Sequence, residues 1–216
     1  MIVRSSNARS VRWVVEMPAR PERAALRDRY DRRRAEVVLD AARVFAARGY
    51  DQTSVPQLAS ELGLAAGSLY HYFGGKEQLL IAICNEIMDP LLERAAELEA
   101  SGLPPVEHLR ALARIWVAHV IAHRDHMLVF QQERHVIDHG DQWRQVRADR
   151  KRFETLADAA LADVERAGAA RFDDRRLALS ALLGMVNHTA QWYRPRGRLS
   201  PEAIADGYTD LLVAAA

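Results

Sequence analysis

Four side chains that can bind nucleic acid lie within one short segment: Ser68, Tyr70, His71 and Tyr72. Hydroxyl and imidazole groups hydrogen-bond to base edges and phosphate oxygens, and aromatic rings contact thymine methyl groups. Thr53, Ser54 and Lys76 flank the segment with two hydroxyls and one ammonium group, which suit phosphate oxygens. These residue types predict a nucleic-acid contact surface, provided that the fold brings them to one face.

Two short helices joined by a tight turn would position these side chains. The first is indicated by apolar residues at positions i, i+3, i+4 and i+7: Val55, Leu58, Ala59 and Leu62. Ser54 and Gln57 have the spacing of a capping box at its start, and Gly63 can end it with a positive φ. The second helix is expected from about Ala65 to Phe73. Such short helices need a support, and the pair is narrow enough for a DNA major groove.

A longer helix from Asp31 to Arg48 is expected to be that support. Its apolar stripe consists of Val38, Ala41, Ala42 and Phe45. Gly49 suits the position just after the last turn. Arg34 and the two arginines before it lie at the start of this helix. We expect this cluster to contact phosphates, although an arginine-rich helix start can also be a solubilising surface.

The run L-G-L-A-A-G-S-L-Y-H-Y-F-G-G-K-E-Q-L-L, residues 62–80, resembles the DNA-binding signature of the TetR family of one-component transcriptional regulators. The resemblance extends over about Arg34 to Leu80. It implies that DNA is contacted by a set of residues in this domain: Arg34, Thr53, Ser54, Ala66, Gly67, Ser68, Tyr70, His71, Tyr72 and Lys76. Pro56 departs from the pattern, because it has no side-chain donor where some relatives carry a base-reading residue. Small residues at the helix start predict few hydrogen bonds to bases and a reliance on methyl contacts and DNA shape.

Composition indicates an all-α fold. Ala, Leu, Arg and Glu dominate, whereas glycine and proline gather at a few breaks. The single cysteine, Cys84, excludes a disulfide framework and a cysteine-based zinc site, which suits a reducing cytoplasm. No apolar run approaches the roughly 20 residues that a membrane span needs.

Charge and pattern divide the chain into three parts. Residues 1–34 contain ten arginines and four acidic residues, a net charge of +6, although the whole chain carries only +1. We expect residues 1–30 to be a basic, mobile arm that helps to neutralise phosphates. Residues 31–75 are expected to form the helix-turn-helix domain, and residues 76–216 a larger helical domain for ligand binding and dimerisation.

The larger domain shows six helical patterns: Lys76 to Ala100, Leu103 to His123, Arg124 to His139, Asp141 to Ala167, Asp174 to Arg194, and Pro201 to Ala214. The stretch Leu177–Trp192 is apolar on nearly every side, so it must be buried on several sides. In the TetR family the last two helices pair with the same two helices of a second subunit. The resemblance therefore implies a homodimer on a palindromic operator.

The resemblance also implies an effector cavity in the middle helices. Its candidate lining residues are Trp116, His119, Met127, Phe130, Gln131, Trp143, Arg147, Met185, Asn187, His188 and Trp192. Aromatic and methionine residues at helical spacing often form plain core instead. The stretch W-Y-R-P-R-G-R-L-S-P-E-A-I-A-D-G-Y from Trp192 resembles a branch that responds to acyl-coenzyme A thioesters. The phosphates of coenzyme A would need a cluster of basic residues near the cavity. The candidates are Arg144, Arg147, Arg150 and Lys151, or alternatively Arg194 and Arg196.

Metal binding and catalysis are not indicated. His119 and His123 are four residues apart and could share an ion, but no glutamate follows the first histidine as in zinc peptidases. No nucleophile elbow or phosphate-cradling glycine loop is present. The sequence therefore predicts a dimeric repressor released from DNA by a hydrophobic or acyl-CoA-type effector, without a cofactor. The alternative is a helical small-molecule-binding or adaptor protein that does not bind DNA.

Overall fold

The computed structural model describes residues 24–213, which consist of helices and short connections. The elements are α1 (Ala24–Arg48), α2 (Val55–Glu61), α3 (Ala66–Phe73), α4 (Lys76–Glu99), α5 (Pro105–Ala122), α6 (Arg124–Gln132), α7 (Arg134–Ile137), the 3-10 helix η1 (Asp141–Trp143), α8 (Arg144–Arg166), α9 (Arg175–Trp192) and α10 (Pro201–Val213). The all-α fold is thus confirmed, and no strand occurs between residues 24 and 213. Most of the expected basic arm, residues 1–23, lies outside the described residues.

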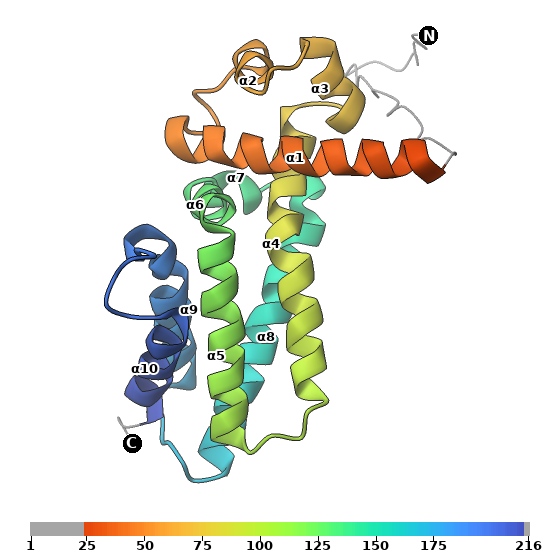
Figure 1. Ribbon diagram of the computed structural model, residues 1–216. Coiled ribbons are helices and arrows are strands. Elements are labelled where there is room, and N and C mark those ends of the chain that lie inside the picture. The colour runs from red at the N-terminus through yellow and green to blue at the C-terminus, as the bar shows by residue number, and fades with distance from the viewer. Residues whose placement is uncertain (1–23, 214–216) are drawn as a thin grey trace.

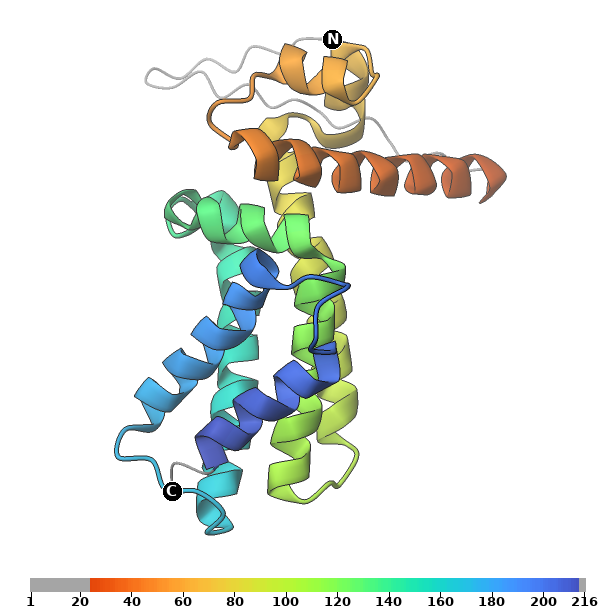
Figure 2. The same cartoon turned by 60° about the vertical axis from the view of Figure 1, so that its left-hand side comes forward.

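Helix α1 lies across one end of a bundle of long helices, and α2 and α3 cover the side of α1 that faces away from the bundle (Figure 1). Helix α4 starts beside α3 and runs down the bundle next to α5 and α8. Helices α9 and α10 form one flank of the bundle (Figure 2). None of the described helices is long and apolar enough to cross a membrane.

Two cores hold these layers together. The body has a core of side chains from α4, α5, α8, α9 and α10, with Trp116 and Leu109 among its largest fully buried members. A second core joins α1, α3 and the start of α4 through Phe45, Phe73 and Leu80. Val129, Ile137, Trp143 and Val146 from the body belong to this second core. The α1–α3 unit therefore rests on the α6–η1 corner as well as on α4.

The predicted capping box of α2 and the predicted glycines after α1 and α2 are confirmed. Ser54 caps α2, and its capping box with Gln57 is complete. Gly49 and Gly63 have positive φ angles of 85° and 61°, a conformation that glycine adopts at no steric cost. Asp174 caps α9 by accepting hydrogen bonds from the backbone amides of Arg176 and Leu177.

Three predicted boundaries were wrong. Helix α1 begins at Ala24 and not at Asp31, because alanine, leucine and arginine at its start all favour helix. The expected helix from Arg124 to His139 is broken at Glu133, whose φ of −94° and ψ of 16° separate α6 from α7. The next helix begins only at Arg144, after the turn of 3-10 helix.

Candidate nucleic-acid interface

The loop between α1 and α2 is fixed from both sides. The hydroxyl of Thr53 is buried and donates to the carbonyl oxygen of Gly49 at 2.8 Å. From the other side the Nζ of Lys76 donates to the carbonyl oxygens of Tyr50 at 2.8 Å and of Thr53 at 3.0 Å. An ammonium group has three donors, so one donor of Lys76 remains for a phosphate. Thr53 serves mainly to hold the turn.

Helix α2 begins directly after its N-cap residue, Ser54. The backbone amide of Ser54 donates to the Oε1 of Gln57 at 2.9 Å, and the Ser54 hydroxyl accepts from the Gln57 amide at 3.4 Å. The Ser54 side chain stays exposed at the helix start. Unpaired amides and the positive end of a helix attract anions such as phosphate.

Helix α3 has one buried face and one exposed face. Leu69 and Phe73 are fully buried in the second core. Tyr70 is 44% exposed, and Gly67 and His71 are also exposed. Gly74 then ends the helix with a φ of 73°. The side chain of Ala66 lies outside the described residues. Since the outer face of α3 carries the predicted DNA contacts, it is the part of the domain that can enter a groove.

Aromatic and cation–π contacts with α1 fix the orientation of α3. The ring of Tyr30, on α1, lies 5.0 Å from the ring of Tyr72 and 6.0 Å from that of His71, centroid to centroid. The Arg34 guanidinium lies over the Phe73 ring at 4.9 Å. Tyr72 and Arg34 are half-buried as a result, so both position α3 in addition to any contact with DNA.

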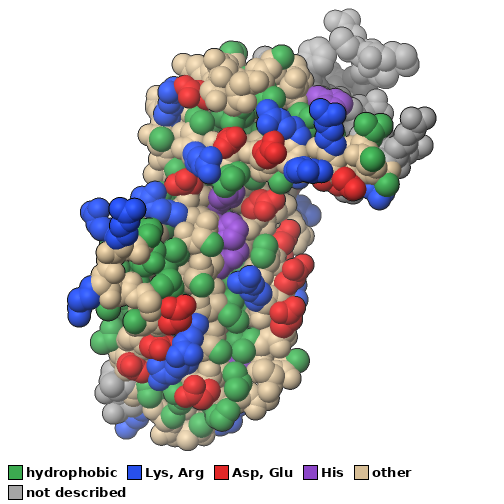
Figure 3. Space-filling model, in the orientation of Figure 1, with side chains coloured by type: hydrophobic (Ala, Val, Ile, Leu, Met, Phe, Trp, Pro, Cys, Tyr) green, Lys and Arg blue, Asp and Glu red, His purple; other side chains and the backbone are tan. Residues whose placement is uncertain are grey.

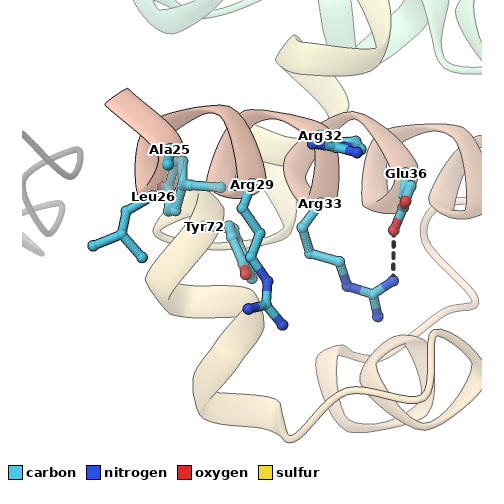
Figure 4. A pocket seen from close by; sticks show the side chains of 8 residues that line it. Ala25, Leu26, Arg29, Arg32, Arg33, Glu36 and Tyr72 are labelled. Atoms are coloured by element: carbon cyan, nitrogen blue, oxygen red, sulfur yellow. Dashed lines mark hydrogen bonds and ion pairs between the residues drawn. The ribbon is translucent and has the colours of Figure 1, made fainter. Parts of the chain in front are cut away.

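A basic hollow lies along α1, beside Tyr72 of α3. Its volume is 890 Å³, and its walls include Arg29, Arg32, Arg33 and Tyr72. Figure 4 shows Arg29 and Arg33 extending from α1 on the side where Tyr72 lies, and Arg33 donates to Glu36 at 2.8 Å. Arg29 makes no ion pair within residues 24–213. A phosphate of DNA that reaches α3 would find these guanidinium groups beside it.

Three of the residues predicted to line an effector cavity lie in three different parts of the fold. Trp116 packs edge-to-face on Phe153 in the body core, with centroids 4.7 Å apart. Trp143 lies in the second core beneath α1. Arg147 donates to the carbonyl oxygens of Ile137 at 3.0 Å and Gly140 at 2.9 Å, so it fixes the turn before α8.

Two other residues of the predicted lining, Gln131 and Asn187, meet between α6 and α9. The Nε2 of Gln131 donates to the carbonyl oxygen of Asn187 at 2.7 Å, and Gln131 lines a hollow of 470 Å³. The other walls of this hollow are Arg124, Leu128, Gln132 and Gln191. His188 and Trp192 are exposed, Phe130 and Met185 are half-buried, and Met127 is buried. The exact lining of the effector site therefore stays a prediction.

Three histidines meet where α5 turns into α6. The rings of His119 and His123 are 4.2 Å apart and those of His123 and His126 are 5.8 Å apart, centroid to centroid. The Nδ1 of His123 contacts the carbonyl oxygen of His119 at 3.1 Å. Burial lowers the pKa of His119 to about 4 and the pKa of His126 to about 4, and the nearby His123 adds to both shifts. Both buried rings are therefore neutral at pH 7.

Comparison with known families decides what the chain is. The family described as "Tetracyclin repressor-like, C-terminal domain" matches residues 102–216, more than half of the chain, and "Bacterial regulatory proteins, tetR family" matches residues 38–83. The chain belongs to the TetR family. Members of this family are DNA-binding transcriptional regulators and not enzymes, so the face of α3 described above belongs to a DNA-binding domain.

Relatives in the TetR family cover most of the chain. The HTH-type transcriptional repressor KstR2 of Rhodococcus jostii RHA1 is 29% identical over 182 residues, 84% of this chain and 89% of that protein. The solved structure of the ketosteroid transcriptional regulator KstR2 of Mycobacterium tuberculosis is 25% identical, with a TM-score of 0.77, and the match covers 84% of this chain and 93% of that one. The crystal structure of AibR with isovaleryl coenzyme A and operator DNA is 30% identical, with a TM-score of 0.72, covering 84% and 98%.

One cation beside α3 was not predicted from the sequence. Arg29 was assigned to the arm, although it lies on α1 and lines the basic hollow. The spacing of Arg29, Arg33 and Glu36 at i, i+4 and i+7 was the available signal, because residues so spaced share one helix face.

Proposed function

We propose that this TetR family protein is a homodimeric repressor that leaves its operator when a hydrophobic or acyl-CoA effector binds. The observation that carries the proposal is the exposed face of α3 with Tyr70 and His71, held on a core shared with the body. One such helix makes few contacts, so two helices in successive major grooves of a palindromic operator are needed for specific binding. The twofold axis of the dimer would then match that of the DNA.

Exposed leucines on the last two helices support the dimer. Leu177 on α9 is 68% exposed and Leu211 on α10 is 64% exposed in the single chain. Trp192, at the end of α9, is also exposed. Burying such side chains against a second copy gains about 1.5–3 kcal/mol each, which favours association through α9 and α10.

An acyl-CoA effector is supported by a solved relative and by two exposed arginines between α9 and α10. AibR, a solved relative, was crystallised with isovaleryl coenzyme A and operator DNA. The arginines of α8 that could hold its phosphates are occupied, since Arg144 pairs with Asp141 at 2.9 Å and Arg150 with Asp138 at 2.9 Å. Arg194 and Arg196 are exposed and make no side-chain bond within the described residues. Figure 3 shows Lys and Arg side chains gathered where the α9–α10 loop lies. We therefore assign the phosphate contacts to Arg194 and Arg196.

The hollow between α6 and α9 supports a route from effector to DNA. Helix α6 bears Gln131 on this hollow and Val129 in the core beneath α1. An effector that shifts α6 would therefore tilt α1 and α3. It acts only through a difference in its affinity for the two states, and a tenfold loss of DNA affinity requires about 1.4 kcal/mol.

Substitution of Tyr70 tests DNA binding. Tyr70→Ala should abolish specific operator binding in a fluorescence anisotropy titration, while sedimentation velocity still shows the wild-type oligomer. Gln145→Ala on the exposed side of α8 is the matched control and should bind like the wild type. Unchanged operator affinity of Tyr70→Ala would contradict the assignment of α3 as the reading helix.

Titration of the protein–operator complex tests the effector. Acyl-CoA thioesters of increasing chain length should release the operator, and the matching free acids should not. The variant Arg194→Gln with Arg196→Gln should need at least about tenfold more thioester, because two phosphate contacts are lost. Release by the free acid alone would exclude the thioester.

A further inference from the structure

Three potential metal ligands meet where the α1–α2 loop touches the α6–α7 corner. These residues are Asp51, Glu133 and His135, and one ligand atom of each lies within 4.8 Å of the others. The Nε2 of His135 is 4.0 Å from the Oδ2 of Asp51. In Figure 1 the α6–α7 corner lies directly beneath α1, near the end that leads into this loop. Residues from two parts of the fold thus converge on one point.

The burial of Glu133, with one carboxylate oxygen left without a partner, points to a bound cation. It is only 6% exposed, and its Oε1 accepts a hydrogen bond from the backbone amide of Tyr50 at 3.3 Å. Its Oε2 is buried and has no hydrogen-bond partner among the described residues. A buried carboxylate oxygen without a partner is costly, and a bound cation removes that cost. The same residue breaks the helix between α6 and α7, so the chain is bent where this carboxylate is buried.

We propose that Asp51, Glu133 and His135 bind a divalent transition-metal ion of the Zn²⁺ type. Two carboxylates and one imidazole suit Zn²⁺ and similar ions, whereas Mg²⁺ and Ca²⁺ prefer oxygen ligands alone. Three protein ligands leave a fourth position for water. The site is separate from the DNA-reading face and from the hollow between α6 and α9.

The geometry requires only small movements. Ligand atoms around a tetrahedral Zn²⁺ ion are about 3.4 Å apart, given metal–ligand bonds of about 2.1 Å. The side chains of Asp51 and His135 are 67% and 65% exposed, so they can rotate by the short distance required. Glu133 is held in place by the hydrogen bond from the Tyr50 amide, so it is the fixed ligand of the site. A simple ion pair between His135 and Asp51 contributes little at such exposure, and it leaves Glu133 Oε2 unpaired.

The ion would join the loop that starts the helix-turn-helix to the body corner that carries α7. Lys76 contacts the same loop from the side of α4, through the Tyr50 carbonyl. A metal bridge therefore restricts the angle between the DNA-binding helices and the body. Zn²⁺ would also stabilise the folded protein by mass action when neither operator nor effector is present.

The test uses the full chain, treated with a chelator and then dialysed. Isothermal titration with Zn²⁺ should show one saturable site per chain, and Co²⁺ should give the visible absorption of a site with nitrogen and oxygen ligands. Asp51→Asn, His135→Gln and Glu133→Gln should each weaken Zn²⁺ binding by at least about tenfold. Asp51 and His135 are exposed, so those two variants remain informative even if Glu133→Gln fails to fold.

His139→Gln is the matched control. His139 is an exposed histidine four residues after His135, and its Nδ1 contacts the His135 carbonyl oxygen at 2.8 Å. This variant should bind Zn²⁺ like the wild type. Binding that requires His139 but survives Asp51→Asn would mean chelation by two surface histidines and would overturn the proposal. Absence of a saturable Zn²⁺ site in the wild type would also overturn it. Operator binding is not measured, so the result does not depend on the proposed function.

Discussion

The Nζ of Lys76 lies 2.8 Å from the carbonyl oxygen of Tyr50 and 4.0 Å from the centre of the Tyr50 ring. Lys76 is the first residue of α4, and Tyr50 belongs to the loop that leads from α1 to α2. One side chain therefore connects the helix that enters the body to the turn that places α2. In a regulator of this family, a tilt of α4 would move the DNA-binding helices through this connection.

Removing this connection should cost stability. Lys76→Met keeps the length of the side chain but loses two hydrogen bonds from a charged donor and the cation–π contact. We expect the free energy of unfolding to fall by about 1–3 kcal/mol, measured by urea denaturation. Lys151→Met is the control, because Lys151 is exposed and makes only a 3.7 Å surface pair with Glu154. Equal stability of both variants would show that the Lys76 connection contributes nothing.

Arg29 should contribute a phosphate contact. Its side chain extends beside Tyr72 in the basic hollow, without an ion pair in the described part of the chain (Figure 4). Arg29→Gln should weaken binding to specific and random duplexes alike, and should lower the slope of log affinity against log salt by about 1. Arg152→Gln on α8 should leave the slope unchanged. A loss of affinity for the operator alone would instead mean that Arg29 reads bases.

The parts of the fold that local sequence determines were predicted correctly. The capping box of Ser54 and Gln57 and the positive φ of Gly63 depend on residues a few positions away, so a single segment contains all the information. The break at Glu133 was missed because nothing local marks it, since residues 131–135 contain neither glycine nor proline. The carboxylate of Glu133 accepts a hydrogen bond from the amide of Tyr50, 83 residues earlier in the chain, and no local pattern shows such a contact.

The effector site was also only partly predictable, because its residues come from helices that are far apart in the sequence. Trp116 and Trp143 were candidates for the cavity lining, with plain core as the alternative, and both are buried in a core. Helical periodicity could not indicate what buries them, and they belong to different cores. Gln131 and Asn187, by contrast, do lie together, although only the packing of α6 on α9 brings them there. Pairing between distant helices is the information that one sequence lacks.

Leu211 tests the dimer. Because its side chain is exposed in the single chain, Leu211→Asp should not disturb the fold of the monomer. It should place a charge in the α9–α10 interface and shift the protein to monomers in sedimentation velocity. Leu39→Asp, at an exposed leucine of α1, is the matched control and should remain dimeric. A wild type that is monomeric at micromolar concentration would contradict the dimer.

The buried histidines should make the protein sensitive to acid. Burial lowers the pKa of His119 and of His126 to about 4, from 6.5 in the unfolded chain. His123 and Arg94 near His119, and His123 and Arg43 near His126, repel a second positive charge, whereas Asp125 opposes this for His126. The unfolded state therefore binds more protons than the folded state between pH 6.5 and 4. The contribution of these two neutral rings to the free energy of unfolding is fully present above pH 6.5 and is lost as the pH falls toward 4.

Each histidine should contribute a loss of up to about 1.4 kcal/mol per pH unit in that window. Urea denaturation at intervals from pH 7.5 to 4 would measure the slope. His119→Gln removes one titrating group and should reduce the slope between pH 6.5 and 4, whatever its effect on stability at pH 7. His188→Gln, at an exposed histidine of α9, should leave the slope as in the wild type. If His119→Gln and His188→Gln give the same slope, burial of His119 is not a source of the acid sensitivity, and the neutral ring assigned to it is wrong.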